Sequence, residues 1–388
     1  MTAHPSVGIA RAEVVGSLLR PGYLRAARQA LREGRTDAAA LRAAEDQAVL
    51  EAIALQEAAG LDVISDGEMR RASWIASIPL REEDPAFRPP VSGYEFFSNL
   101  GPGWIRGWRD SRGRPVQRPG QRAVVTRRLR VERDIVADEY EFLKAHARRR
   151  TKYTFPAPSY HRVFWHPEHS RTAYPTVDDF LRDVRDYIRE EVVKRLLRLG
   201  CDYIQLDAPN YGQIYTDAEL RAQFEAEGHD LHANLIVDAE IDNSVFEGIR
   251  GVTRALHICR GNGPGGIWSA AGGYDVLAPE LFPRLTNIDT LLLEYDTPRA
   301  GDLSPLRYVL PHTTVVLGLI TTKSGTLEDE AVVEQRIQEA TRYVPLERLA
   351  LSPQCGFNSA LEGNPLTPVE QEAKLRLVSR VARRVWLR

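Results

Sequence analysis

Short runs of aliphatic residues alternate along this chain with longer segments in which apolar side chains recur at every third or fourth position. The short runs are rich in Val, Ile and Leu, which is typical of strands buried on both faces. They predict eight strands, at 14–17, 62–65, 153–155, 203–206, 255–259, 291–294, 315–318 and 349–351. The longer segments have the period of amphipathic helices. They predict helices that include 22–33, 40–59, 176–199, 231–249, 328–342 and 367–384.

The alternation of strand and helix indicates an α/β fold, because neighbouring parallel strands need a crossover connection that is usually a helix. Eight such repeats favour a single (β/α)8 barrel of the TIM type, with residues 1–388 as one domain. An open, doubly wound parallel sheet is the alternative. Two helix starts support the boundaries, because Thr176 precedes an acidic turn and Thr367 precedes Pro368.

Residues 81–130 interrupt this alternation between the second and third predicted strands. The stretch contains many Pro, Gly, Arg and aromatic residues, which is typical of an irregular connection. Within it, 94–97 and 123–126 have the composition of strands and could pair as a hairpin. We therefore expect an inserted excursion at about 81–130, which is either a long decorated loop or a lid over a substrate.

Composition and charge indicate which kinds of molecule the protein can bind. The chain has 388 residues, of which 43% are hydrophobic and 27% charged, and the formal net charge is -2. This balance gives no basic field that would attract nucleic acids or anionic membranes. No apolar run reaches the roughly 18 residues of a membrane span, and the N-terminus has no signal-peptide pattern. We therefore expect a cytoplasmic protein that acts on small molecules, without nucleic-acid or membrane partners.

In a β/α barrel, the active site lies at the carboxyl ends of the strands and in the loops that follow them. In this chain these positions hold a polar set: Ser17, Asp66, Glu68, Ser159, Asp207, His257, Cys259, Glu294, Thr322, Lys323 and Cys355. The third cysteine, Cys201, follows Gly200 at a predicted helix end and is interpreted as a core thiol. Three cysteines are too few for a disulfide framework.

Four residues of the polar set predict a zinc site. His257 and Cys259 are two positions apart, so their side chains point to the same face of a strand. Glu294 and Cys355 end two later strands. One imidazole, two thiolates and one carboxylate suit Zn²⁺. Zinc bound by thiolates is well suited to hold a substrate thiol as thiolate, so the sequence predicts alkyl transfer to a thiol, with methyl as the first choice.

Two other classes of function remain to be weighed. A zinc-stabilised scaffold without catalysis usually takes its ligands from positions close together in sequence, whereas these four are widely spaced. A decarboxylase of the uroporphyrinogen type needs no metal and leaves the four residues unexplained.

Five short motifs carry a resemblance to a known family: VGS at 15–17, DGE at 66–68, YIQLD at 203–207, HICRGN at 257–262 and SPQCGF at 352–357. In this order they resemble the catalytic domain of cobalamin-independent methionine synthases and their single-domain relatives. The likeness runs from about residue 12 to 385. It implies a barrel on which a homocysteine thiolate, activated by zinc, attacks a methyl donor.

The resemblance assigns roles to particular residues. It places the metal ligands on His257, Cys259, Glu294 and Cys355, in agreement with the argument from strand ends. It also implies that Ser17, Glu68 and Asp207 hold the carboxylate and amino groups of homocysteine. Two acidic side chains near a substrate ammonium make electrostatic sense, because a buried cation needs a counter-charge. A helix cap or a surface ion pair is the structural alternative for each of the three.

Departures from the family pattern leave the methyl donor open. The family's usual Asp-Glu-Pro is Asp207-Ala208-Pro209 here, and Lys323 occupies the position of a histidine that the long enzymes use near the folate leaving group. Asp207 and Lys323 are the candidate catalytic residues. Lys323 is a candidate general acid, an anchor for an anionic donor or a solvated loop cation. The donor is then a folate or a non-folate compound such as a methyl group on a corrinoid protein. Alkyl transfer to another thiol, as in epoxyalkane:coenzyme M transferases, is the alternative, and homocysteine ranks first because Glu68 and Asp207 are present.

Overall fold

The structure is a computed structural model that describes residues 9–75, 84, 86–87, 89–101, 103–116, 121–359 and 363–387. Its strands are β1 (Val63–Ile64), β2 (Val91–Phe97), β3 (Arg122–Val131), β4 (Arg150–Thr151), β5 (Tyr153–Pro156), β6 (Tyr203–Asp207), β7 (Thr253–Ile258), β8 (Thr290–Glu294), β9 (Thr314–Ile320) and β10 (Leu349–Pro353). Its α-helices are α1 (Gly22–Arg32), α2 (Ala38–Ala59), α3 (Phe142–His146), α4 (Val177–Tyr187), α5 (Lys194–Arg198), α6 (Pro209–Tyr215), α7 (Ala218–Ala226), α8 (Leu231–Ser244), α9 (Ala278–Leu281), α10 (Glu330–Ala340) and α11 (Pro368–Trp386).

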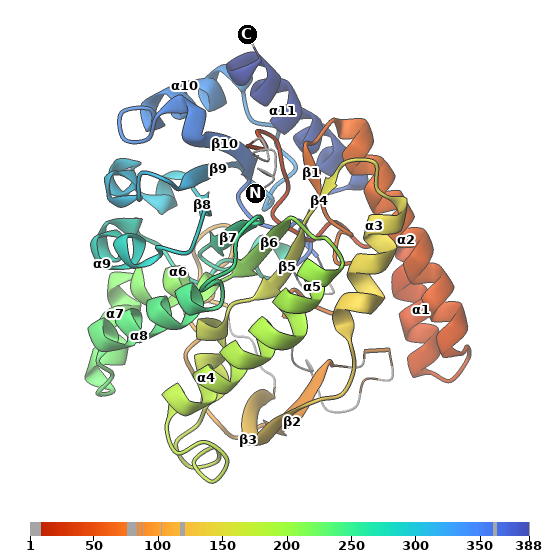
Figure 1. Ribbon diagram of the computed structural model, residues 1–388, viewed down its shortest axis with the longest axis vertical. Helices are drawn as coiled ribbons and strands as arrows, with labels where there is room; N and C mark the ends of the chain where they lie inside the picture. Colours follow the sequence, from red (N-terminus) through yellow and green to blue (C-terminus); the bar gives the residue numbers. More distant parts are fainter. Residues whose placement is uncertain are drawn as a thin grey trace.

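Parallel strands occupy the centre of the molecule, and helices surround them (Figure 1). Six strands form one parallel sheet in the order β10-β9-β8-β7-β6-β5, and β1 pairs with β4 in parallel. Isolated parallel bridges join Ala12 to Leu351 and Glu13 to Val63. Neighbouring strands follow the sequence order, without the reversal that a doubly wound sheet has. The predicted α/β class with a parallel sheet is therefore confirmed.

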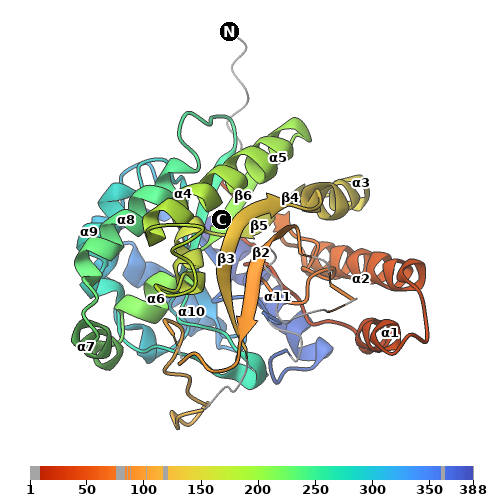
Figure 2. The same ribbon diagram turned by 90° about the horizontal axis from the view of Figure 1, so that it is seen from below.

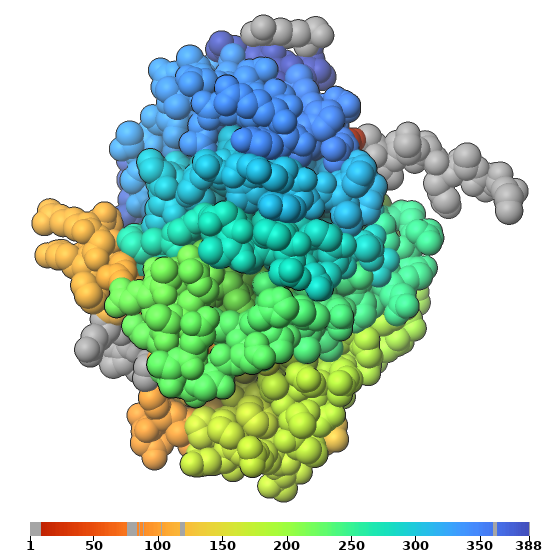
Figure 3. Space-filling model, turned by 90° about the vertical axis from the view of Figure 1, so that its left-hand side faces the viewer, coloured from red at the N-terminus to blue at the C-terminus, as the bar shows by residue number. Residues whose placement is uncertain are grey.

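Consecutive segments of the chain also follow one another around the surface. In Figure 3 the yellow-green, green, cyan and blue parts of the chain succeed one another from the bottom to the top of the visible face. This arrangement follows from the topology, because each strand is followed by its own helical connection before the next strand begins.

The first predicted strand is wrong in its position. The pairing of this segment falls at residues 12–13, and 14–17 is not a strand. The reason is that the backbone of 14–17 forms hydrogen bonds with loops and, among the described residues, does not pair with a neighbouring strand. The carbonyl oxygen of Ser17, for example, accepts a hydrogen bond from the backbone N–H of Phe357. The other predicted strands overlap observed ones, with shifts of one or two residues at their ends.

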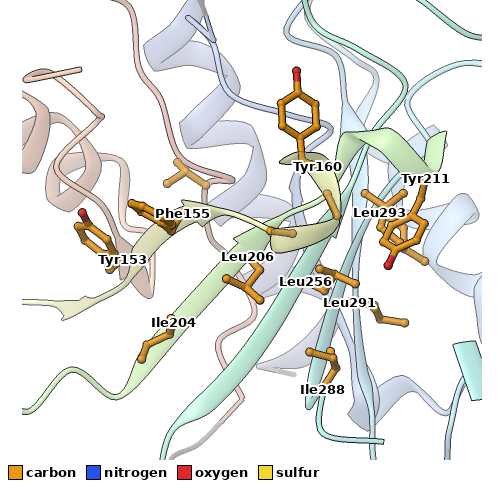
Figure 4. Close-up of a cluster of buried hydrophobic side chains, with 14 of the residues drawn as sticks. Tyr153, Phe155, Tyr160, Ile204, Leu206, Tyr211, Leu256, Ile288, Leu291 and Leu293 are labelled. Atoms are coloured by element: carbon orange, nitrogen blue, oxygen red, sulfur yellow. The ribbon is translucent and has the colours of Figure 1, made fainter. Parts of the chain in front are cut away.

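The two faces of each central strand have different neighbours. Figure 4 shows part of the cluster on one face, with Ile204 and Leu206 of β6 beside Leu256 of β7 and Leu291 and Leu293 of β8. The alternate positions form a second buried cluster: Val15, Val63, Tyr203, Ala255, Leu292, Val316 and Ala350. Because side chains alternate along a strand, the residues that continue this second face at the strand ends are polar ones. They are Asp207, His257 and Glu294.

The excursion contains the predicted hairpin. Strands β2 and β3 pair antiparallel, with Tyr94 opposite Val125 and Phe97 opposite Arg122. The hairpin lies in the foreground when the molecule is viewed from below (Figure 2). Ser170 fastens it to the loop that precedes α4, because its hydroxyl donates to the carbonyl oxygen of Val125 at 2.6 Å. The prediction of a hairpin at 94–97 and 123–126 is confirmed.

The helices begin where their capping residues predict. Thr176 and Asp179 form a capping box at α4, and Thr367 and Glu370 form one at α11, where Pro368 is the first helical residue. In the described part of the chain, no helix combines the length and the apolar character that crossing a membrane requires.

Candidate active site

Three side chains of metal-binding type meet at the carboxyl ends of β7 and β10. His257 lies in β7, Cys259 follows that strand directly, and Cys355 follows β10. One possible ligand atom from each residue lies within 4.8 Å of the other two, and all three residues are buried. The structure thus brings together three of the four predicted metal ligands, although nearly a hundred residues separate the two cysteines in sequence.

The imidazole of His257 has the orientation of a metal ligand. Its Nδ1 lies 3.2 Å from the carbonyl oxygen of Leu292, and donation to that oxygen leaves Nε2 with a free lone pair. Nε2 is buried and has no hydrogen-bond partner among the described residues. Metal-binding histidines commonly fix their tautomer by such a contact to a backbone carbonyl. One imidazole nitrogen beside two cysteine sulfurs is a donor set that fits Zn²⁺.

The two cysteine thiols of this group differ in acidity. A hydrogen bond between them raises the pKa of Cys259 well above its ordinary value and lowers the pKa of Cys355 well below its own. Burial and the nearby charge of Glu294 add to the rise at Cys259, whereas His257 favours the thiolate of Cys355. The thiolate is the form that binds a metal, so this surrounding favours metal binding at Cys355.

Glu294 ends β8 beside this group, and its carboxylate faces cations. Its Oε2 accepts a hydrogen bond from the backbone N–H of Arg260 at 2.8 Å, and its Oε1 accepts one from the guanidinium of Arg299. Burial alone would raise the pKa of Glu294, but Lys323, Arg299 and Arg260 lower it to about 2. Glu294 is therefore an anion at the edge of the site. Its place as a fourth metal ligand stays a prediction.

Lys323 lies in the loop that follows β9. Its Nζ is 3.8 Å from Oε1 of Glu294, and the side chain is only 11% exposed. Nζ makes no hydrogen bond to any residue in the part of the chain described. An ammonium that is neither solvated nor fully paired is available to a ligand. This surrounding argues against the solvated loop cation and leaves the general acid and the anchor for an anionic donor.

Asp207 and Glu68 each present a carboxylate oxygen to which no described residue donates a hydrogen bond. Asp207 ends β6 and is the register partner of His257 on β7. Gln205 Nε2 donates to Oδ1 of Asp207 at 2.7 Å, and no described residue donates to Oδ2. Thr154 Oγ1 donates to Oε1 of Glu68 at 3.1 Å, while Oε2 is buried without a partner.

The electrostatic surroundings of these two carboxyl groups disfavour their ionised forms. Burial raises the pKa of Asp207 to about 7, against the opposing influence of His257, and the charge of Glu68 adds to the rise. Burial also raises the pKa of Glu68, although Arg71 and Arg20 oppose this. Glu68 has a φ of 57°, in the left-handed region that residues other than glycine seldom adopt. A bound ammonium would relieve the cost of both buried anions.

Ser17 contacts the loop that carries Cys355. Its Oγ accepts a hydrogen bond from the backbone N–H of Asn358 at 3.3 Å. A Cβ atom on Gly356 would lie 2.0 Å from this Oγ, so the close approach of the two segments requires glycine. The predicted substrate residue Ser17 is therefore buried next to the loop that carries Cys355, and it is not a helix cap.

Asn262, in the motif that follows β7, ties two site loops together. Its Nδ2 donates to the carbonyl oxygen of Gly356 at 2.7 Å and to Ser359 Oγ at 3.0 Å. Asn364 in turn donates to Asn262 Oδ1 at 3.1 Å. These bonds hold the loop of Cys355 against the loop that follows Cys259.

The excursion reaches the same loop after β7. Arg109 and Trp268 exchange two backbone hydrogen bonds, of 2.7 and 3.0 Å. Arg106 pairs with Glu227 next to α7 at 2.7 and 2.6 Å. The excursion is thus fastened to the side of the site that carries His257 and Cys259. Its role as a lid stays a prediction, and its residues 81–83, 85, 88, 102 and 117–120 lie outside the described residues.

Two members of the polar strand-end set serve the scaffold. The hydroxyl of Ser159 donates to Asp242 at 2.6 Å, which ties the segment after β5 to α8. Thr322 Oγ1 donates to Gln354 Oε1 at 2.7 Å and joins the loops after β9 and β10.

Sequence reasoning missed the residues that orient the site: Gln205, Asn262 and Arg299. Gln205 carried a usable signal, because it stands two positions before Asp207 and so shares its strand face. Asn262 stood within a recognised motif. Arg299 carried none, since only the folded loop shows that its guanidinium meets Glu294.

Comparison with known proteins decides the family. The family model described as "Cobalamin-independent synthase, Catalytic domain" matches residues 11–87, which include Ser17 and Glu68. The uncharacterized protein YxjH of Bacillus subtilis is 35% identical over 381 residues, which cover 97% of this chain and 94% of that protein. The chain belongs to the cobalamin-independent methionine synthase family.

Other members of the cobalamin-independent methionine synthase family extend this likeness. A methionine synthase of Sulfolobus acidocaldarius is 25% identical over 349 residues, covering 89% of this chain and 84% of that protein. A Listeria monocytogenes crystal structure, provisionally assigned as a vitamin-B12-independent methionine synthase, matches with a TM-score of 0.70 and 26% identity. It covers 98% of this chain and 99% of that chain.

Membership of the family confirms the resemblance drawn from the five motifs and supports a methyltransferase of the methionine synthase type. The expectation that the protein acts on small molecules is consistent with this family. A corrinoid protein as the carrier of the methyl group, which the sequence left as a candidate, is not supported, because the family is cobalamin-independent.

Proposed function

We propose that this protein transfers a methyl group to the sulfur of homocysteine and so forms methionine, with a Zn²⁺ ion held by His257, Cys259 and Cys355 and with Glu294 as the fourth ligand. The observation that carries the proposal is the buried Nε2 of His257, which has no hydrogen-bond partner among the described residues and lies beside two cysteine sulfurs. When bound, Zn²⁺ supplies a Lewis acid that favours the thiolate form of the acceptor at neutral pH.

The acidic side chains of the site bind and orient the acceptor. Oε2 of Glu68 and Oδ2 of Asp207 receive the ammonium of homocysteine, and Ser17 lies near its carboxylate. Support comes from the two oxygens that lack donors among the described residues, and from burial, which disfavours both anions although Arg71 lies 3.7 Å from Oε1 of Glu68. A coenzyme M acceptor has a sulfonate and no ammonium, and so leaves these oxygens without a partner.

Lys323 acts on the methyl donor, for which we propose a folate. In the transfer, the acceptor sulfur forms a bond to the methyl carbon while the bond from that carbon to the donor nitrogen breaks. The departing nitrogen then needs a proton, which the Nζ of Lys323 can supply. The poorly solvated position of Nζ, without a hydrogen bond to the described residues, supports this role.

We also infer that the strands close into a (β/α)8 barrel that makes residues 1–388 one domain. Support comes from the bridges at Ala12 and Glu13, which join β10 to β1, and from the backbone N–H of Lys152, which donates to the carbonyl oxygen of Ile64 and extends the β1-β4 pairing toward β5. The cytoplasmic location stays a prediction.

The proposal is tested by incubating the zinc-loaded protein with 5-methyltetrahydrofolate and either homocysteine or coenzyme M, and measuring the methylated thiol. The matched control is Cys201→Ser, which changes a buried cysteine that lies outside the metal-binding group. We expect methionine from the wild-type protein and from Cys201→Ser, and none from Cys355→Ser. Methylation of coenzyme M in preference to homocysteine would overturn the assignment of the acceptor.

A further inference from the structure

A chain of buried polar side chains leads to Asp207 along the strand face that carries the site. Lys152 stands between β4 and β5, and its Nζ donates to Glu13 Oε2 and to Gln205 Oε1, each at 2.8 Å. Gln205 Nε2 donates to Oδ1 of Asp207 at 2.7 Å and to the carbonyl oxygen of Val15 at 3.0 Å. The side chains of Lys152 and Glu13 are 0% and 1% exposed. None of the roles assigned above involves Lys152 or Glu13.

The ammonium of Lys152 determines which way the amide of Gln205 points. An ammonium has only donors, so it must face the amide oxygen, and the amide NH₂ must then face the opposite side. On that side lie two acceptors, Oδ1 of Asp207 and the carbonyl oxygen of Val15. The reverse orientation would place NH₂ against the ammonium and oxygen against the carboxylate, with both contacts repulsive.

The orientation of the amide has a consequence for Asp207. Gln205 binds Oδ1 and so fixes the rotation of the carboxylate, which leaves Oδ2 as the oxygen without a protein donor. Without the NH₂ of Gln205, nothing in the described part of the chain donates to either oxygen. The carboxylate would then be free to rotate, and the ammonium of an acceptor would have to order it at a cost in affinity.

Glu13 allows Lys152 to be charged inside the protein. Its carboxylate accepts from Lys152 at 2.8 Å and from the hydroxyl of Tyr203 at 2.9 Å. A buried ammonium is tolerated only with a counter-ion and satisfied hydrogen bonds, and Glu13 and Gln205 provide both. Held by Glu13, the ammonium of Lys152 is therefore a fixed hydrogen-bond donor to Gln205 at the start of this series of polar side chains.

We propose that Lys152 and Gln205 are positioning residues for the acceptor's ammonium, acting through Asp207, and that they give the site its preference for a thiol that is also an amino acid. This proposal rests on the proposed function, because it takes Asp207 as a ligand of that ammonium. It requires no contact between Lys152 and the substrate.

The test measures dissociation constants by calorimetry on the zinc-loaded protein for two acceptors, homocysteine and 4-mercaptobutanoate, which is homocysteine without its amino group. The variants are Gln205→Met, the charge-neutral pair Glu13→Gln with Lys152→Met, and all three changes together. The pair removes both members of the ion pair, so that no unpaired charge remains buried. Gln371→Met, which also removes a buried glutamine with a backbone contact, is the matched control.

We expect Gln205→Met to raise the dissociation constant of homocysteine by about threefold to tenfold, because the ligand must then order the freed carboxylate of Asp207. The constant for 4-mercaptobutanoate should change less than about twofold, and zinc content and the Gln371→Met control should not change. The charge-neutral pair should weaken homocysteine binding in the same direction. Adding that pair to Gln205→Met should have almost no further effect, because Lys152 acts through Gln205.

Two results separate failure of this proposal from failure of the proposed function. Wild-type protein that binds both thiols equally well would show that no ammonium is recognised and would overturn the assignment of the acceptor. If the wild type prefers homocysteine while the variants weaken the binding of both thiols equally, or of neither, Lys152 and Gln205 have only a structural role. The same conclusion follows if the effects of the pair and of Gln205→Met on homocysteine binding are additive. Should Gln205→Met not fold, the charge-neutral pair decides by the same comparison of the two thiols.

Discussion

Two buried glutamates at the carboxyl ends of parallel strands, Glu68 after β1 and Glu294 at the end of β8, have opposite surroundings. Glu294 accepts hydrogen bonds from Arg260 and Arg299 and lies 3.8 Å from Lys323, and despite its burial these cations lower its pKa to about 2. Oε2 of Glu68 is buried with no donor among the described residues, and burial raises the pKa of Glu68 even though Arg71 lies 3.7 Å from its Oε1.

The difference shows how one residue type can serve two purposes on one fold. The protein itself supplies the counter-charges of Glu294, so this carboxylate is an anion whether or not a ligand is present. The counter-charges near Glu68 are incomplete, so its anion becomes favourable when a cation arrives from outside. The first surrounding suits a group next to a metal, and the second suits the recognition of a substrate ammonium.

The largest effect should come from removing one of the proposed zinc ligands that lie beside Glu294. Cys259→Ser removes one sulfur ligand, so we expect bound zinc to fall from one per chain to near zero and methyl transfer to fall on the order of a thousandfold or more. Elemental analysis and a methionine assay measure the two quantities. Zinc that remains at one per chain in Cys259→Ser would remove this residue from the ligand set, and Cys201→Ser serves as the control.

A smaller effect is expected at Lys323, on the same side. Lys323→Met removes the proton donor for the leaving nitrogen, so kcat should fall by about a hundredfold while the dissociation constant of homocysteine is unchanged. Steady-state kinetics and calorimetry separate the two. The exposed Lys194→Met is the control. A loss of homocysteine affinity with no change in kcat would assign Lys323 to the acceptor instead.

A change at Glu68, the glutamate proposed to bind the substrate, should alter the affinity for homocysteine. Glu68→Gln keeps the shape of the side chain and removes its charge, so we expect the dissociation constant of homocysteine to rise about tenfold to a hundredfold. Zinc content should not change. Glu45→Gln, a buried glutamate of α2, is the matched control. Loss of zinc in Glu68→Gln would show that the two sides of the site are not separable.

The smallest effect should come from pH. Burial raises the pKa of Asp207 to about 7, so acid protonates this group and removes a negative charge that attracts an ammonium. Between pH 8 and 6, the preference for homocysteine over 4-mercaptobutanoate should therefore decline by about tenfold in total. The ratio of the two dissociation constants removes pH effects on the thiol and the metal. In Asp207→Asn the ratio should be lower and should depend less on pH.

The parts of the fold that sequence analysis predicted are those with a strong local signal. Aliphatic strands such as 203–206, helices with capping residues such as Thr367, and even the hairpin of the excursion were predicted near their observed places. The first strand was misplaced because loop residues, such as Phe357, bind the backbone of Ser17. No local pattern of the first segment reveals a partner more than three hundred residues away.

The residues of the candidate site likewise fall into those that the sequence could predict and those that it could not. His257, Cys259 and Cys355 could be predicted because strand ends converge and because the residue types suit zinc. The cations around Glu294 could not, since Arg299 meets this carboxylate through the path of a loop. The orientation of Asp207 by Gln205 and Lys152 likewise depends on side chains from separate strands.

The central claim is that His257, Cys259 and Cys355 hold a zinc ion to which the homocysteine sulfur is added. It is tested most directly by zinc content together with zinc-edge X-ray absorption, recorded with and without homocysteine. We predict one zinc per chain with two sulfur neighbours, rising to three when homocysteine is added, at about 2.3 Å each. A protein that binds no zinc, or a sulfur count that stays at two in the presence of homocysteine, would contradict this account.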